Sequence, residues 1–533
     1  MKNTFKIKFI SALLLLATLL GGCDGQGAES TTPPCEHVWA DATCSAPKTC
    51  TACGATEGEA LAHDWAEATP FVPKTCKVCG KTEGEKLECP IPDHLNLALA
   101  IEKIPVATAD MTEQELRDII VEFMNIQLNF AFTPDFGDTL DSYGYHIKNL
   151  YKPSKGNLYL ANTKITFEEG KYYGGIPYVG NAAGSLYRWL EFYDPETGVM
   201  NWDPIIRTKR KNWVSGDVTY PDVGSAIFGN SCSASCVWSW LRVSNSVDSF
   251  WTNGWVPSNG FVKVGDYDLN DEDQQGDDTT ALCKSNGQTK MFKAYAEIKK
   301  ADGIVNSTHA RMCVSDAVVV YNEYGRIDGE KSYVIIADQD CTFLTASPQK
   351  GGVPRSCPLN DKGDIYYILG SNYPGNIVNG ELTDMKRSFN SLYEKGYLPF
   401  TIPELCGKDD VEKSEVGLYK SNAVYADSTV KASELRTMEI RSNYAISDIH
   451  FIVRDAAGNE VFSAMYAKLG NSVPALKNYS VSDAISDNPL YQSKGYINLA
   501  IWEYAEKGNH TLEITARLST GELLTVYKGK LTE

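Results

Sequence analysis

The sequence predicts an α+β protein with several domains, and three observations support this prediction. The chain has 533 residues, which is too long for one compact domain and suggests about three. Residues 96–405 alternate segments of helical spacing with segments of strand spacing. Residues 407–533 contain short alternating strands separated by turns, and residues 35–90 repeat a small cysteine-rich pattern. We therefore expect small repeats, then a mixed α+β domain, then an all-β module.

The first residues predict export and a lipid anchor. Residues 1–22 carry three lysines and an apolar run that is too short to span a bilayer, as in an export signal. The run ends in LLGGC, which resembles the lipobox of bacterial lipoproteins and implies that Cys23 carries lipid. A plain signal peptide with an incidental cysteine is the alternative. Residues 23–34 are polar and predict a flexible tether, so we expect the protein at the cell membrane, facing the exterior.

The next segment contains two copies of one unit. His37 and Trp39 of the first copy correspond to His63 and Trp65 of the second, at a shift of 26 residues. Units this short cannot bury a useful apolar core, so they need metal or cross-links. Each copy contains C-x-x-C followed by glycine, a spacing typical of metal knuckles.

We expect the repeats to hold structural zinc. Because the protein is exported, disulfide bonds are the alternative. The second copy has Pro70 where the first has Cys44, so its site would draw on Cys89 or stay incomplete. The copies resemble short His-Trp/C-x-x-C repeats of gut-bacterial surface proteins, which look like zinc ribbons. The candidate ligands are Cys35, Cys44, Cys50, Cys53, His63, Cys76, Cys79 and Cys89, with His37 beside them.

The mixed domain is expected to begin with a helix over residues 111–132. Its apolar residues have helical spacing, and Thr112 and Glu115 form a capping-box pattern. Further along, residues 309–321 and 332–339 predict the two strands of a hairpin. If the turn centres near Ile327, Cys313 and Cys341 would face each other across it.

Cys232 is the candidate nucleophile of this domain. It lies in GNSCSASCVWSW (residues 229–240), at the start of a predicted helix, where backbone N–H groups lower the pKa of a thiol. A disulfide with Cys236 is not expected, because residues four apart on a helix lie near the distance limit for such a bond. We expect Cys236 to be a buried apolar residue.

A nucleophilic thiol needs a base and a group that orients the base. The other six of the seven histidines fall in the repeats, in linkers or in the C-terminal module, which leaves His309 at the head of a strand. The next strand ends in ADQD, so Gln339 is the first choice for the orienting residue and Asp338 the second.

These motifs together resemble the NlpC-type, papain-like cysteine peptidases of bacterial cell walls. GGIPYV is similar to their Gly-x-Pro-Tyr turn, whose tyrosine, here Tyr178, lies near the nucleophile. The cysteine motif is similar to their Asp-Cys-Ser-Gly, with Ser231 in place of Asp and Ala234 in place of Gly, and ADGIV resembles the turn before their histidine. The resemblance implies a papain-like domain that needs no cofactor for catalysis. Ser231 and the long separation between the two catalytic residues depart from the family pattern.

The C-terminal module is expected to be an immunoglobulin-like β-sandwich. Short alternating segments separated by turns such as AAGN and STGE favour this arrangement. The expected strands are residues 434–442, 448–455, 460–468, 496–505, 510–518 and 523–531.

Composition and motifs together favour a surface-anchored cysteine hydrolase that cleaves an amide bond, by resemblance in peptidoglycan peptides. The net charge of −18 argues against nucleic acid as a partner, because phosphate binding needs basic patches. The alternative is a non-catalytic cell-wall-binding or adhesin lipoprotein with a degenerate papain-like domain. A host-directed protease or transglutaminase-like enzyme would share the same site and differ only in substrate.

Overall fold

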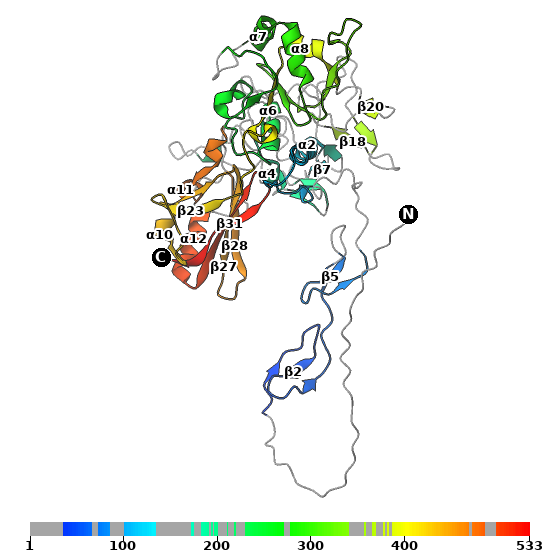
Figure 1. Ribbon diagram of the computed structural model, residues 1–533. Coiled ribbons are helices and arrows are strands. Elements are labelled where there is room, and N and C mark those ends of the chain that lie inside the picture. The colour runs from blue at the N-terminus through cyan, green and yellow to red at the C-terminus, as the bar shows by residue number, and fades with distance from the viewer. Residues whose placement is uncertain are drawn as a thin grey trace, which may run out of the picture. The chain divides into compact units, whose positions relative to one another are not determined.

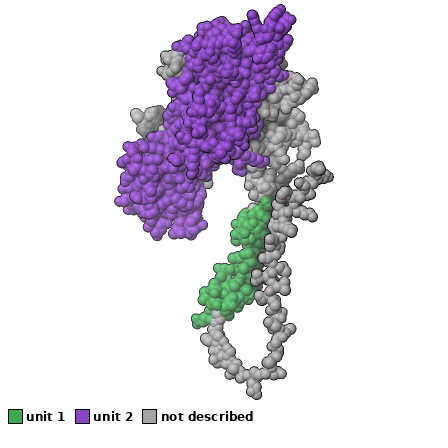
Figure 2. Space-filling model, in the orientation of Figure 1, with its two compact units in different colours: residues 1–87 green, residues 88–533 purple. Residues whose placement is uncertain are grey.

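The computed structural model describes most of the chain after residue 35. The described residues are 36–66, 73–85, 101–129, 230–270, 278–339, 386–467, 472–485 and 497–533, with short stretches between 131 and 219 and between 356 and 382. The chain divides into two compact units, residues 1–87 and 88–533 (Figure 2). In the described residues, the longest and most apolar helices still fall short of what a membrane crossing requires.

The first unit contains two small antiparallel sheets of three strands each. Both copies have the same register, because Trp39 lies opposite Cys50 and Trp65 opposite Cys76. The buried apolar residues described in this unit are three cysteines, Cys44, Cys50 and Cys76. The copies therefore fold alike and have almost no apolar core. The strands are β1 (Trp39–Ala40), β2 (Lys48–Cys50), β3 (Thr56–Glu57), β4 (Trp65–Ala66), β5 (Lys74–Cys76) and β6 (Thr82–Glu83).

The second unit begins with the expected helix, α2 (Glu113–Asn129). The capping box is present: the Thr112 backbone N–H donates to Glu115 Oε2 at 2.8 Å, and the Glu115 N–H donates to Thr112 Oγ1 at 3.3 Å. One face of α2 packs against α6 (Cys232–Trp240) in the protein core (Figure 1). The sequence therefore predicted this helix and its start correctly.

A six-stranded antiparallel sheet carries the candidate site. Helix α6 packs against β15 of this sheet, and both are buried. Trp240, Trp255 and Phe261 form an aromatic cluster beneath Gly303, which has no room for a side chain. In spatial order the strands are β13 (Val262–Lys263), β22 (Leu398–Thr401), β14 (Gly303–Val305), β15 (Ala310–Cys313), β16 (Tyr333–Ala337) and β21 (Lys386–Ser388).

Further elements flank this sheet. Three helices, α7 (Thr279–Asn286), α8 (Gln288–Ala296) and α9 (Phe389–Glu394), pack against one another. A second six-stranded sheet has the order β17-β18-β8-β7-β10-β9. Its strands are β17 (Ser356–Pro358), β18 (Ile365–Ile368), β8 (Tyr172–Gly174), β7 (Ala131–Pro134), β10 (Val199–Met200) and β9 (Tyr193–Asp194), with helix α4 (Leu186–Leu190) beside it. Two strand pairs, β11 (Arg210–Lys211) with β12 (Val218–Thr219) and β19 (Ile377–Val378) with β20 (Glu381–Leu382), complete this part.

The expected contact between Cys313 and Cys341 is not supported by the hairpin register. Tyr321 bridges Ile327, so the turn lies before Ile327, and Cys313 lies opposite Ile336. Cys313 is buried with a free thiol, while Cys341 lies outside the described residues. The prediction placed the turn a few residues too late.

In the C-terminal segment, residues 407–533, the described residues form two sheets and the helices α10, α11 and α12. Figure 1 shows the helices beside the sheets. The expected strand at 496–505 is wrong, because these residues lie largely in helix α12 (Ile497–Lys507). Ile501 and Ala505 are buried and lie four residues apart, which is helical spacing, and Gly508 ends the helix with a positive φ of 67°. One sheet has the order β24-β23-β26-β29, and the other β25-β31-β30-β27-β28.

The bounds of these elements are as follows. The strands are β23 (Val416–Lys420), β24 (Ala423–Val424), β25 (Thr429–Lys431), β26 (Glu439–Ser442), β27 (Ile446–Arg454), β28 (Glu460–Tyr466), β29 (Asn478–Ser480), β30 (His510–Leu518) and β31 (Leu523–Thr532). The other two helices are α10 (Ala432–Leu435) and α11 (Val481–Ile485).

Candidate active site and metal-ligand clusters

Cys232 is the first residue of helix α6. Ser231 caps the helix: its Oγ accepts a hydrogen bond from the Ala234 backbone N–H at 3.3 Å. Ser231 stands where the resemblance expected an aspartate, and it performs the capping that an aspartate would also perform. The side chain of Cys232 is therefore fixed at the end of the helix where backbone N–H groups favour a negative charge.

The environment of Cys232 favours the thiolate. Burial works to raise the pKa of this thiol, but the nearby His309 imidazolium and hydrogen bonds from His309 and from the Ala310 backbone N–H outweigh it. The net result is a lowered pKa. Cys236, one turn later on the same helix, has a free thiol whose pKa is raised well above its usual value by burial. The pKa values of these two neighbouring cysteines are thus shifted in opposite directions.

His309 is held rigidly at the head of β15. Its backbone N–H donates to Asn306 Oδ1 at 2.8 Å, and its carbonyl accepts from the Asn306 N–H at 2.9 Å. Its Nε2 lies 2.5 Å from Asp338 Oδ1, so Nδ1 is the nitrogen that is left for Cys232. Burial works to lower the pKa of His309, but Asp338 and Cys232 together raise it well above its usual value.

The residue bound to His309 is Asp338 and not Gln339, the first choice from sequence for the orienting residue. Asp338 directly follows β16, is fully buried, and binds His309 through one oxygen. Gln339 is also buried, but its Oε1 accepts a hydrogen bond from Ser235 Oγ of α6 at 3.3 Å. Because consecutive residues of an extended strand point to opposite sides, only one of the two can face His309. In the register observed, that residue is Asp338.

Arg311 and Tyr397 are two site residues that sequence reasoning missed. Arg311 Nε donates to the second oxygen of Asp338 at 2.6 Å, and its Nη1 donates to the Tyr397 hydroxyl. Burial alone would raise the pKa of Asp338, but His309 and Arg311 hold it well below its usual range. A signal was present in the sequence: residues two apart on a strand share a face, so His309 predicts that Arg311 lies beside it.

The buried side-chain amide of Gln127 connects α2 to α6. Gln127 of α2 donates through Nε2 to the Ser235 carbonyl at 3.1 Å and to Ser239 Oγ at 2.8 Å. Its Oε1 accepts from Asn230 Nδ2 at 3.4 Å, just before the helix starts. These bonds connect α2 to both ends of the segment that positions Cys232. The predicted Tyr178 and Cys23 lie outside the described residues.

The repeats bring seven cysteine and histidine side chains into two clusters. The first contains His37, Cys50 and Cys53, and the second contains Cys44, His63, Cys76 and Cys79. In each cluster the ligand atoms lie within 4.8 Å of one another. Cys35 and Cys89 lie outside the described residues. These groups could hold a metal ion.

The second cluster takes its fourth ligand from the first repeat. Cys44 Sγ lies 3.7 Å from Cys76 Sγ, and Cys79 Sγ lies 3.4 Å from His63 Nδ1. Two sulfurs bound tetrahedrally to one zinc at about 2.3 Å would be about 3.8 Å apart, so this spacing fits a metal. Burial opposes ionisation of Cys76, but backbone N–H groups and His63 lower its pKa to about 6. The ligand that is missing at Pro70 is thus supplied by the preceding copy.

The two sites suggest different kinds of chemistry. Cys232, His309 and Asp338 have the contacts of a nucleophile, a base and an orienting acid. The repeats offer one set of four thiol and imidazole ligands, which suits a structural metal, and one set of three. No model of a known protein family matches the chain, and no curated protein matches it. The function proposed below therefore depends on the geometry of the site and on the sequence.

Proposed function

We propose that the protein is a cysteine hydrolase that cleaves an amide bond through a thioester. The observation that carries this proposal is the chain of contacts from Cys232 to His309 to Asp338 at the start of α6. A buried thiol alone is inert, but a lowered thiol pKa beside a histidine with a raised pKa describes a thiolate–imidazolium pair.

The proposed reaction has two steps. Cys232 Sγ attacks the carbonyl carbon, and the C–N bond breaks as His309 Nδ1–H gives its proton to the leaving amine. Water, deprotonated by His309, then attacks the thioester, which releases the acid and restores the thiolate. The backbone N–H of Cys232 at the helix start is suited to stabilise the oxyanion. Asp338 keeps the imidazole in the required orientation.

The proposed substrate is a peptide of the bacterial cell wall, at an amide bond of its stem or cross-bridge. Support comes from the sequence motifs that resemble NlpC-type peptidases. The lipobox-like LLGGC with Cys23 supports a lipid anchor at the outer face of a membrane, where such peptides are found. Peptidoglycan and the membrane are therefore the proposed partners.

A non-catalytic wall-binding protein is the second candidate. The observation that favours it is the exposure of Cys232, which is only 4%. A substrate carbonyl must reach Sγ, so a thiol that stays covered would leave only a binding role for the same fold.

Labelling separates the two candidates. The purified full chain is treated with an iodoacetamide probe at pH 6, and the labelled peptides are mapped. We expect Cys232 to be labelled and Cys236 not, because the pKa of the Cys232 thiol is lowered and that of the Cys236 thiol is raised. Purified peptidoglycan is then digested with the chain and with Cys232→Ser. Absent labelling of Cys232, or equal digestion by both proteins, would refute the enzyme proposal.

We also propose that the repeats bind structural zinc. Cys44, His63, Cys76 and Cys79 would hold one ion, and His37, Cys50 and Cys53 would supply three ligands to another. Because Cys44 comes from the first copy and the other three ligands from the second, the ion would join the two copies. Metal analysis of the purified chain tests this, and free thiols together with no bound metal, or disulfide-linked repeats, would refute it.

A further inference from the structure

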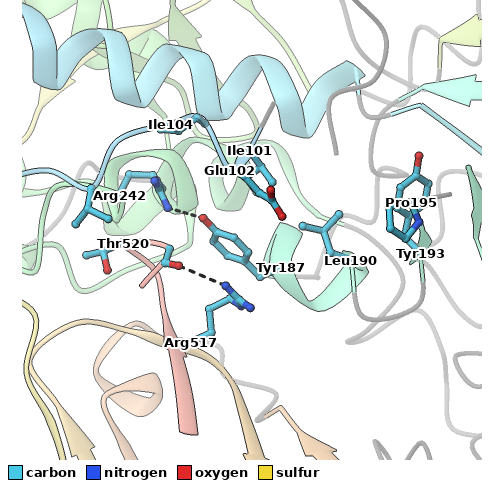
Figure 3. Close-up of a pocket in the computed structure, with 12 residues that line it drawn as sticks. Ile101, Glu102, Ile104, Tyr187, Leu190, Tyr193, Pro195, Arg242, Arg517 and Thr520 are labelled. Atoms are coloured by element: carbon cyan, nitrogen blue, oxygen red, sulfur yellow. Dashed lines mark hydrogen bonds between the residues drawn. The ribbon is translucent and has the colours of Figure 1, made fainter. Parts of the chain in front are cut away.

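A cavity of about 540 Å³ lies in the second unit, away from the residues of the candidate active site (Figure 3). Its walls come from four places: the segment before α2, helix α4 with the residues after it, the end of α6, and β30 with the turn that follows it. Part of its lining is apolar, namely Ile101, Ile104, Val106 and Leu190. We call this space the arginine cavity, because Arg242 and Arg517 also line it.

The two guanidinium groups gather around one tyrosine. Arg242 Nη1 lies 2.5 Å from the Tyr187 hydroxyl, and the Arg517 guanidinium stacks 5.2 Å from the centre of the same ring. Figure 3 shows both arginines directed toward Tyr187 from different elements. Arg517 also donates to the Gly521 carbonyl at 3.4 Å. The polar groups of the cavity therefore converge on a small region.

The positive charge in this region lacks a bound carboxylate. Arg242 is only 2% exposed, and its Nη2 donates to the Pro105 carbonyl, while its Nε has no hydrogen-bond partner. Within the part of the chain that the structure describes, neither guanidinium forms an ion pair within 4.0 Å. Removing a cation from water without a bound anion is costly, so a buried arginine in this state is suited to an anionic ligand.

Three acidic groups lie in the surroundings and help to define the ligand. Glu522 and Asp448 act on Arg242 and Tyr187 only at a distance, and Asp448 Oδ1 is taken by His450 at 2.9 Å. Glu102 lines the cavity with an exposed carboxylate. The cavity thus combines a cationic end, an apolar wall and one acidic residue at its mouth.

Gly521 keeps the cationic end open. Its φ is +95°, and a Cβ placed on it would lie 2.1 Å from Arg242 Nη1 and 2.4 Å from the Tyr187 hydroxyl. A side chain at this position would displace both groups. The glycine therefore lets the turn approach the guanidinium closely.

We propose that the arginine cavity binds a small ligand that carries a carboxylate on an apolar body. The carboxylate would lie between Arg242, Arg517 and the Tyr187 hydroxyl, where a planar guanidinium forms charge-assisted hydrogen bonds. The apolar body would contact Ile101, Ile104 and Leu190. This site is separate from the proposed cysteine chemistry and does not depend on it.

Calorimetric titration of the full chain with N-acetyl-leucine, at fixed ionic strength, tests the proposal. N-acetyl-leucinamide, which has the same apolar body and acetyl group and a neutral amide in place of the carboxylate, is the control ligand. We expect saturable binding of N-acetyl-leucine and none of N-acetyl-leucinamide. Arg517→Met should weaken binding roughly tenfold or more, because it removes a charge-assisted hydrogen bond. Gly521→Ala should also weaken it, and Arg326→Met, at an exposed arginine elsewhere, should leave it unchanged.

Several results would overturn the proposal. One is absence of binding by N-acetyl-leucine, and another is equal binding of N-acetyl-leucinamide. Unchanged binding in Arg517→Met would show that the ligand lies elsewhere. Inorganic phosphate bound as tightly, with the same dependence on Arg517, would show a general anion site and refute the carboxylate. Circular dichroism of each variant confirms that it is folded, and Cys232→Ser should bind like the original chain.

Discussion

Replacing His309 by glutamine should abolish the reactivity of Cys232 at acidic pH. In the folded protein the imidazolium and its hydrogen bond oppose the effect of burial on the thiol. In His309→Gln, the pKa of the Cys232 thiol would depend on burial, which raises it, and on the Ala310 N–H and the helix start, which lower it. We expect the pKa of the thiol to return to its ordinary value of 9.0 or above.

The size of the effect follows from the thiolate fraction. At pH 6, a thiol with the ordinary pKa of 9.0 is thiolate to only about one part in a thousand. The lowered pKa of Cys232 makes its thiolate fraction larger, by up to about 1000-fold for a thiol that is fully ionised. The thiolate of a thiol with a higher pKa is more nucleophilic, which offsets part of this difference, so we expect the labelling rate of His309→Gln at pH 6 to fall about tenfold or more.

The assay is the rate of iodoacetamide labelling of Cys232 between pH 5 and pH 10, measured by peptide mapping. The labelling rate of the original chain should rise by less than tenfold per pH unit between pH 6 and pH 9, whereas that of His309→Gln should rise about tenfold per pH unit over this range. His450→Gln is the matched control, because His450 also binds a buried aspartate, Asp448, but in the C-terminal segment. Equal rates for the original chain and His309→Gln at pH 6 would refute the thiolate–imidazolium pair.

Three further predictions concern stability and metal binding. Asp338→Asn should lower the free energy of unfolding, measured with urea at pH 7, by about 3–5 kcal/mol, because it leaves Arg311 and His309 without their buried carboxylate. Because the pKa of Asp338 is depressed in the folded state, its contribution to stability is present above about pH 4 and is lost as the pH falls further. A difference in stability between the original chain and Asp338→Asn that does not become smaller below pH 4 would contradict this. Gly303→Ala should lower the free energy of unfolding by about 1–3 kcal/mol, since a Cβ would lie 2.6 Å from both Trp240 and Trp255. Gly417→Ala, where the nearest atom is at 3.3 Å, should lower it less. Equal losses of stability would show that the aromatic cluster moves to make room for the methyl group. Cys44→Ser should remove one thiolate ligand from the second cluster, which would weaken the sulfur-to-metal charge-transfer absorption of the protein loaded with cobalt in place of zinc. Cys406→Ser, at a cysteine outside both clusters, should leave this absorption unchanged. The opposite pattern would exclude Cys44 as a ligand.

The sequence predicted the features that depend on local signals. The capping box at Thr112 and Glu115 and the strand repeat of the small units are short-range patterns, and the structure contains both. The start of α6 at Cys232 is another local feature, since Ser231 has a side chain that can cap a helix.

The features that sequence reasoning missed depend on tertiary register. Asp338 and Gln339 are adjacent, so the choice between them needs the orientation of β16, which local patterns do not contain. The segment 497–507 has few polar residues in its first half, so its pattern fits a strand as well as a helix. Which of the two forms depends on the contacts that the segment makes with the rest of the protein. Cys44 lies in the same cluster as Cys76, which is 32 residues later in the sequence, so this contact between the two copies depends on tertiary structure.

The buried arginines of the second unit show why the arginine cavity needs a ligand. Arg117, 4% exposed, binds Asp302 at 2.9 Å and Glu113 at 2.8 Å, and Arg311, 9% exposed, binds Asp338 at 2.6 Å. Arg242 is more buried than either, but its described hydrogen-bond partners are a tyrosine hydroxyl and a carbonyl, and its guanidinium otherwise lies over the rings of Phe123 and Tyr187. The same chain thus supplies a carboxylate to two buried guanidiniums and leaves the third facing a cavity. An anion from outside the chain would give Arg242 the partner that Arg117 and Arg311 already have.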